Sequence, residues 1–191
     1  MSDAIRCFLA LKIPADTALR RLLKELGAMG RALRAVEPDG LHVTLKFFAA
    51  AEPASIPEIG SIATTVAGKH KRTELTLTGL GAFPHPERPS VIWAGLAGPG
   101  AQTLCSLAGQ FEETLETIGF ERENRPFQPH LTLARVKFRP PEELRALLTR
   151  HANTVFGTTA VDEIELIRSE PGPEGPRYTV LEHFPLAAKL P

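Results

Sequence analysis

Alternating apolar and polar positions run through several short stretches of the chain, and this period-two pattern is typical of half-buried β-strands. The pattern predicts strands at residues Ile5–Lys12, His42–Phe48, Glu74–Leu80, Ser90–Leu96, His130–Val136, Ala160–Arg168 and Arg177–Phe184. The turn PGPEGP at residues 171–176 is expected to join the last two strands. The segment FPHPERP at residues 83–89 is expected to be a loop, because proline cannot donate a hydrogen bond to a neighbouring strand.

Apolar residues recur at helical spacing in four other stretches of the chain. They predict helices at about Asp16–Leu33, Ile56–Ala67, Gln102–Ile118 and Pro141–Arg150. Asp16 is expected to cap the first of these helices, because its carboxylate can accept a hydrogen bond from the first helical turn. Helices and strands in this mixed order predict the α+β fold class.

One sequence pattern occurs twice, as HVTLKFF at residues 42–48 and as HLTLARV at residues 130–136. Composition alone rarely places His-x-Thr-Leu twice in a chain that has only six histidines. Strand alternation puts His42, Thr44 and Lys46 on one face, and it puts His130 and Thr132 together on the second strand. The repeat therefore suggests two related lobes that bring these polar faces together.

Two imidazoles and two hydroxyls on facing strands suit attack on a phosphodiester without a metal ion. With an unperturbed pKa of about 6.5, one imidazole can act as base while the other acts as acid near neutral pH. Thr44 and Thr132 could donate hydrogen bonds to non-bridging phosphate oxygens. A metal site would need a third ligand, and neither tetrad offers Asp or Glu on its polar face, so no metal is predicted. The structural alternative is that both histidines are half-buried strand residues.

Charge and composition narrow the range of partners. The 191 residues are 43% hydrophobic and 23% charged, as in ordinary globular proteins. Lys plus Arg and Asp plus Glu both number 22, so the chain lacks the basic excess that a broad duplex-binding surface requires. A nucleic acid partner would therefore be held locally, at an end or at a single phosphate.

The two cysteines, Cys7 and Cys105, have a spacing that suits neither a zinc ribbon nor a redox pair, so free thiols in a reducing cytosol are expected. No apolar run approaches the roughly 20 residues needed to span a bilayer. The sequence therefore predicts a cytoplasmic protein.

Five segments together resemble a known family. These are RCFLAL at residues 6–11, LHVTLKFF at residues 41–48, SVIWAGL at residues 90–96, RPFQPHLTLARV at residues 125–136 and GPRYTVL at residues 175–181. They resemble the two-histidine phosphoesterase superfamily, and within it the RNA 2',3'-cyclic phosphodiesterases, also called 2'-5' RNA ligases. The resemblance implies a bilobal fold, with two antiparallel-sheet lobes, outer helices and a central cleft. Residues 1–191 would form one bilobal domain, with lobes near residues 1–98 and 99–191 and with strands that can cross between them.

The resemblance also implies an activity, which is metal-independent hydrolysis of RNA 2',3'-cyclic phosphate ends to 2'-phosphomonoesters without any cofactor. Family members also join RNA ends in a 2'-5' linkage without ATP. By resemblance, His130 is the base, His42 is the acid, Thr44, Thr132 and Arg135 hold phosphate, and Phe47 stacks on the terminal base. Lys46 is a weaker candidate for phosphate binding.

The expected partners are RNA ends or tRNA fragments with a 2',3'-cyclic phosphate, and small cyclic nucleotides. We expect a monomer without an obligate protein partner. Two alternatives stay open at this point. One is a 2'-5' phosphodiesterase that acts on oligoadenylate or another small diester, and the other is a non-catalytic module that binds RNA ends.

Overall fold

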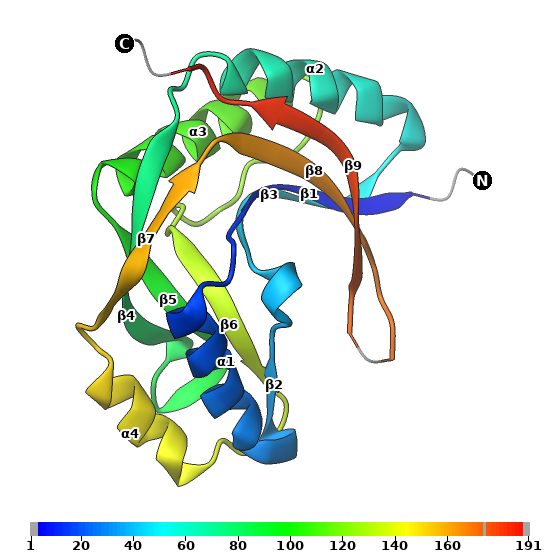
Figure 1. Cartoon of the computed structure of the whole chain (residues 1–191). Coiled ribbons are helices and arrows are strands. Elements are labelled where there is room, and N and C mark those ends of the chain that lie inside the picture. Colours follow the sequence, from blue (N-terminus) through cyan, green and yellow to red (C-terminus); the bar gives the residue numbers. More distant parts are fainter. Residues whose placement is uncertain (1–3, 174, 189–191) are drawn as a thin grey trace.

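The computed structural model describes residues 4–173 and 175–188, and these residues form nine strands and four α-helices (Figure 1). The strands are β1 (Ile5–Lys12), β2 (Leu33–Ala35), β3 (His42–Ala51), β4 (Thr73–His85), β5 (Arg88–Ala97), β6 (His130–Val136), β7 (Val155–Val161), β8 (Glu163–Glu170) and β9 (Arg177–Pro185). The helices are α1 (Thr17–Ala28), α2 (Ile56–Ala67), α3 (Pro99–Glu116) and α4 (Glu142–Arg150). The predicted α+β class is confirmed.

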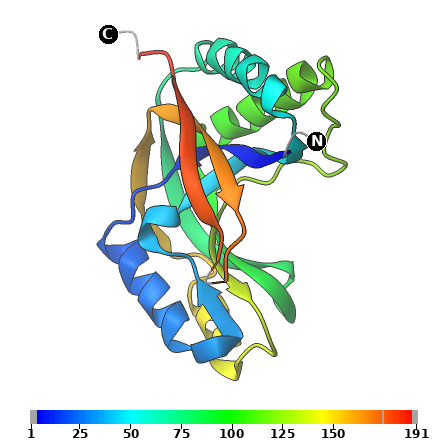
Figure 2. The same ribbon diagram turned by 90° about the vertical axis from the view of Figure 1, so that its right-hand side faces the viewer.

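The strands form two antiparallel sheets. One has four strands in the order β3-β1-β8-β9, and the other has five in the order β2-β6-β5-β4-β7. Helix α2 packs against β8 and β9, whereas α1 and α4 pack against the five-stranded sheet. Helix α3 contacts both β3 and β4, so it joins the two sheets (Figures 1 and 2).

Both sheets draw strands from both halves of the chain. Strands β4 and β5 come before residue 98 but lie in the same sheet as β6. Strands β8 and β9 come after residue 98 but lie in the same sheet as β1 and β3. The sheets therefore do not divide at the expected boundary near residue 98. One continuous cluster of buried side chains includes Leu9 of the four-stranded sheet, Leu133 of the five-stranded sheet and Phe111 of α3. This cluster packs between the two sheets and is shared by them.

Most of the predicted elements form where the apolar pattern places them, with three corrections. The proline-rich segment at residues 83–89 is not a loop, because the β4–β5 ladder continues through it to the pair His85 and Arg88. Pro84 and Pro89 lie opposite each other beside a register shift, near the end of the hairpin, where few ladder hydrogen bonds are lost.

The second correction concerns the first helix, which ends at Ala28 rather than at residue 33. Gly30 has a φ of 81°, which glycine adopts readily, and the chain then turns into β2. The third correction concerns the predicted strand Ala160–Arg168, which is two strands on different sheets. Within residues 4–173 and 175–188, no helix has both the length and the apolar character that crossing a bilayer requires.

Candidate active site

The two repeated tetrads lie on neighbouring strands of different sheets. Strand β3 is an edge of the four-stranded sheet, β6 lies between β2 and β5, and the two strands contact each other. His42 and His130 are the first residues of β3 and β6, and both are half-buried. The fold therefore brings together the two strands that carry the repeat.

Each tetrad contains a β-bulge at its leucine. In β3, Thr44 lies opposite Ala10 and Lys46 lies opposite Leu9, so Leu45 is an extra residue. In β6, Thr132 lies opposite Trp93 and Ala134 lies opposite Ile92, so Leu133 is an extra residue. A bulge interrupts the alternation of faces and commonly redirects side chains next to active sites.

The bulges decide which side chains share a face with the histidines. After each threonine, two successive residues are buried, first the leucine and then Lys46 or Ala134. Phe47 and Arg135, the next residues, return to the partly exposed face. Strict alternation would have turned both of them toward the core. The bulges thus place the two predicted ligand-binding residues, Phe47 and Arg135, on the side of the histidines and threonines.

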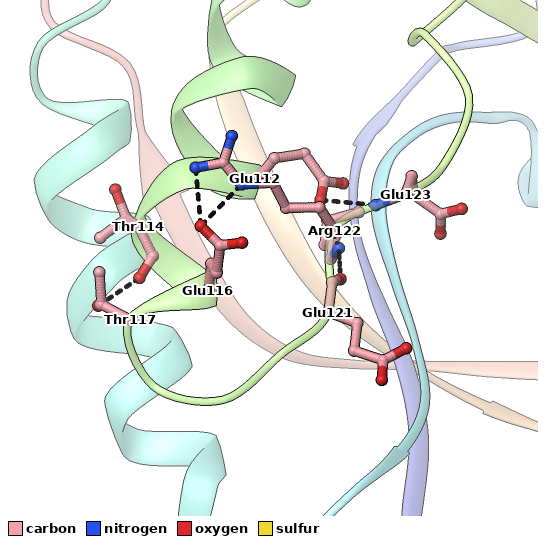
Figure 3. Close-up of polar contacts among 8 residues, drawn as sticks. Glu112, Thr114, Glu116, Thr117, Glu121, Arg122 and Glu123 are labelled. Carbon is pink, nitrogen blue, oxygen red and sulfur yellow. Dashed lines mark hydrogen bonds and ion pairs between the residues drawn. The ribbon is translucent and has the colours of Figure 1, made fainter.

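Lys46 does not lie on this face, and the prediction that it shares the face of His42 is wrong. The residue is only 4% exposed. Its Nζ donates hydrogen bonds to Oε2 of Glu112 and to the backbone oxygen of Glu121, each at 2.7 Å. Glu112 Oε2 also accepts a hydrogen bond from the backbone nitrogen of Glu123 at 3.0 Å (Figure 3). Lys46 therefore ties β3 to α3 and to the loop after it.

The main chain holds both histidine rings in the same way. Nδ1 of His42 lies 2.7 Å from the backbone oxygen of Gly40, and Nδ1 of His130 lies 2.8 Å from that of Gln128. A carbonyl oxygen can only accept a hydrogen bond, so each Nδ1 carries a proton and donates it. Nε2 of each ring remains the atom that can take up or release a proton.

Aromatic rings surround His42 on two sides. The Phe8 ring stacks on it with centroids 4.7 Å apart, and the Tyr178 ring meets it edge-on at 5.2 Å. Burial lowers the pKa of His42, the hydrogen bond to Gly40 opposes this, and the positive charges of Arg135 and His130 lower it further. His130 and Arg135 are therefore near enough to His42 for their charges to act on its ring.

His130 and Phe47 have aromatic or cationic neighbours of their own. The Phe83 ring meets the His130 ring edge-on at 5.0 Å. The Arg6 guanidinium lies 4.6 Å from the centre of the Phe47 ring, which also packs against the small apolar cluster of Phe8, Ala10 and Ile167. One face of Phe47 is therefore covered by Arg6, and this limits how a base can stack on it.

Tyr178 is a site residue that sequence reasoning missed. It lies on β9, far along the chain from both tetrads, and touches His42 and Phe8 with its ring. The segment GPRYTVL contains it and carries part of the family resemblance. That segment was the only indication in the sequence that Tyr178 belongs to the site, because a single tyrosine in a strand does not by itself indicate a site.

One group in the described part of the chain could hold a metal ion. It consists of Glu163, Glu165 and His183, whose ligand atoms lie within 4.8 Å of one another. His183 Nδ1 lies 3.2 Å from Glu163 Oε1 and 3.7 Å from Glu165 Oε1. Neither tetrad histidine belongs to this group.

Comparisons with known proteins identify similar chains over nearly the whole length. The family model of the 2'-5' RNA ligase superfamily matches residues 14–173. The RNA 2',3'-cyclic phosphodiesterase of Aeropyrum pernix is 35% identical over 164 residues, which cover 85% of this chain and 92% of that protein. The protein of the same name from Methanothermobacter thermautotrophicus is 33% identical over 187 residues, which cover 95% of this chain and 99% of that protein.

Solved structures are also similar to this chain over nearly its whole length. The crystal structure of TT0787 of Thermus thermophilus superposes with a TM-score of 0.82 at 29% identity, covering 97% of this chain and 100% of that one. The structure of Escherichia coli LigT complexed with 3'-AMP superposes with a TM-score of 0.73 at 26% identity, covering 96% of this chain and 98% of that one.

Proposed function

The chain belongs to the 2'-5' RNA ligase superfamily, and we propose that it hydrolyses RNA ends that carry a 2',3'-cyclic phosphate to 2'-phosphomonoesters. The similar proteins of Aeropyrum pernix and Methanothermobacter thermautotrophicus bear the name of this activity. The observation that carries the proposal is the matched pair of histidines. Both rings are oriented through Nδ1 by a main-chain oxygen, and this leaves Nε2 of each ring as the atom that would transfer a proton.

The proposed reaction divides the two proton transfers between the two rings. Nε2 of His130 takes a proton from water while the water oxygen bonds to phosphorus. The bond from phosphorus to the ribose O3' breaks, and Nε2 of His42 gives its proton to O3'. The products are a 2'-phosphate and a free 3'-hydroxyl. The lowered pKa of His42 makes it a stronger acid, although it reduces the fraction that is protonated at neutral pH.

Three further side chains are assigned to the phosphate. The hydroxyls of Thr44 and Thr132 would donate hydrogen bonds to the non-bridging oxygens, where negative charge is held during transfer. The Arg135 guanidinium would add a charge-assisted contact to the same group. Phe47 would offer the terminal base the ring face that Arg6 leaves open.

Ligation is a second candidate activity, and the name of the matching superfamily favours it. The same site would join two RNA strands if a 5'-hydroxyl replaced water as the attacking group. Phosphorus would then bond to that oxygen, O3' would leave as before, and a 2'-5' linkage would result. No nucleotide cofactor would be consumed, because the cyclic phosphate itself supplies the bond that breaks.

We further assign to the protein a single bilobal domain, a monomeric state and a cytoplasmic location. Both tetrads and the continuous core lie within one chain, which therefore supplies every group that the reaction uses. The two unpaired cysteines, Cys7 and Cys105, suit a reducing compartment.

The activity can be tested with an RNA oligonucleotide that ends in a 2',3'-cyclic phosphate, incubated with the purified protein and EDTA. We expect complete conversion to the 2'-phosphate at the rate measured without EDTA. Binding without turnover would contradict the enzymatic assignment, and a 3'-phosphate would mean that the other ester bond breaks. Loss of the rate in EDTA would place a metal ion in the reaction. A longer, 2'-5' linked product from an added 5'-hydroxyl strand would establish ligation.

A further inference from the structure

Two arginines face each other across neighbouring strands beside the candidate active site. Arg34 of β2 lies directly opposite Arg135 of β6 in an antiparallel pair. Directly opposite residues share a face of the sheet, and like charges in such pairs destabilise it. Arg34 is half-buried, which adds to the cost of holding two positive charges together.

No carboxylate relieves this repulsion within residues 4–173 and 175–188, where neither Arg34 nor Arg135 forms an ion pair. Other arginines of the chain do have acidic partners. Arg168 pairs with Glu170 at 3.2 Å, and Arg122 pairs with Glu116 at 2.8 Å. The chain has enough acidic residues for pairing, since its formal charge is zero. Two opposed guanidiniums without a counter-charge are a typical arrangement for binding an anion.

A third arginine joins this group around Tyr178. Burial raises the pKa of the Tyr178 phenol, and the positive charges of Arg135, Arg6 and Arg34 oppose the rise. The guanidinium of Arg34 also lies against Gly175, where an added Cβ would come within 2.0 Å of its Nη2. The positive charges of three arginines, on β1, β2 and β6, thus act on the tyrosine whose ring touches His42.

One cyclic phosphate does not account for three guanidiniums. Arg135 follows His130 on its own strand and is already assigned to the phosphate that reacts. Arg34 lies one strand further out, about 5 Å from Arg135 between Cα atoms. The group that an RNA end would present beside its reacting phosphate is the phosphodiester on the 5' side of the same nucleotide.

We propose that Arg34, supported by Arg6 and the Tyr178 hydroxyl, forms a subsite for the phosphate on the 5' side of the terminal nucleotide. The inference rests on the proposed function and specifies its substrate class. The protein prefers an oligonucleotide end, or a nucleotide with a 5'-phosphate, to a cyclic mononucleoside phosphate that lacks this group. The small number of cations at the subsite agrees with the zero net charge of the chain.

The test compares kcat/KM for three substrates that differ only on the 5' side. These are 2',3'-cyclic AMP, the same nucleotide with a 5'-phosphate, and a dinucleotide that ends in the cyclic phosphate. We expect the two substrates with the added phosphate to react about tenfold or more faster, because one charge-assisted contact has that magnitude. This advantage should shrink as salt is raised. Equal kcat/KM values for the three substrates would overturn the subsite without affecting the proposed hydrolysis.

Variants assign the preference to Arg34. Arg34→Gln should reduce the ratio of dinucleotide to mononucleotide kcat/KM about tenfold, and Arg34→Lys should retain part of it. Arg168→Gln is the control, because Arg168 also lies on a strand but is more exposed to solvent and pairs with Glu170. An equal loss on both substrates in Arg34→Gln would contradict the proposal. Circular dichroism spectra verify that each variant is folded.

A binding measurement keeps the subsite testable even if no turnover is found. Calorimetry would compare adenosine 2'-phosphate with a dinucleotide that ends in a 2'-phosphate. Tighter binding of the dinucleotide, lost in Arg34→Gln, would support the subsite in the absence of catalysis. Equal affinities would contradict it.

Discussion

His42 is held in an environment that favours its neutral form. Phe8 and Tyr178 remove water from the ring, and Arg135 and His130 repel a proton from it. The hydrogen bond from Nδ1 to Gly40 acts in the opposite direction, because a protonated ring donates more strongly. The resulting pKa lies below the ordinary value of 6.5. A bound cyclic phosphate would partly cancel the positive field and favour protonation of His42 in the complex.

The pKa of His42 can be followed by NMR titration of its ring. We expect a midpoint below 6.5, and we expect Arg135→Ala to raise the midpoint because it removes a positive charge nearby. Arg168→Ala, which removes a charge paired with Glu170, should leave the midpoint unchanged. A midpoint that does not respond to Arg135→Ala would contradict the placement of Arg135 beside His42.

The lowered pKa of His42 also makes the stability of the protein depend on pH. The unfolded chain binds a proton at His42 near pH 6.5, whereas the folded chain binds it only at a lower pH. The free energy of unfolding that depends on His42 is therefore fully present above pH 6.5. It decreases as the pH falls from 6.5 toward the pKa of the folded state.

At the scale of single elements, the two bulges show where sequence reasoning reaches its limit. A bulge is defined by the pairing with the partner strand, so it cannot be read from an ideal alternation of faces. In HLTLARV a signal did exist, because Leu133 and Ala134 are consecutive apolar residues and shift the phase of the pattern. In HVTLKFF the charged Lys46 concealed the same shift. The assignment of Lys46 to the polar face was wrong for this reason.

Lys46 is expected to stabilise the contact between β3 and α3 without taking part in the reaction. Lys46→Met keeps the aliphatic stem but leaves Glu112 without its buried cation, so the free energy of unfolding should fall by about 2 to 4 kcal/mol. Chemical denaturation measures this change, with the exposed Lys24→Met as control. The kcat/KM of the folded protein should stay the same. A loss of activity without a loss of stability would contradict the structural role.

At the scale of the whole molecule, much of the fold follows from local patterns. The bounds of β1, α2 and β6 agree with the apolar periodicity. The family resemblance is confirmed by the match of residues 14–173 to the 2'-5' RNA ligase superfamily and by the similarity to two RNA 2',3'-cyclic phosphodiesterases. The resemblance implies that strands can cross between the two halves, but which strands cross could not be predicted, because strand pairing depends on contacts between residues far apart in the chain. Tyr178 and Arg34 come to the site through this exchange and through the pairing of β2 with β6. For the same reason, the sequence indicates the tetrads, Arg135 and Phe47, but not Tyr178 or Arg34.

In the proposed mechanism, His42 and His130 divide acid and base catalysis in one site. The most direct measurement is the rate of hydrolysis of an RNA 2',3'-cyclic phosphate by His42→Ala and His130→Ala. Each variant should lose about two to four orders of magnitude in rate while remaining folded, and His70→Gln, whose side chain lies beside Gln110, should keep its activity. Undiminished hydrolysis by either folded alanine variant would contradict this division of roles.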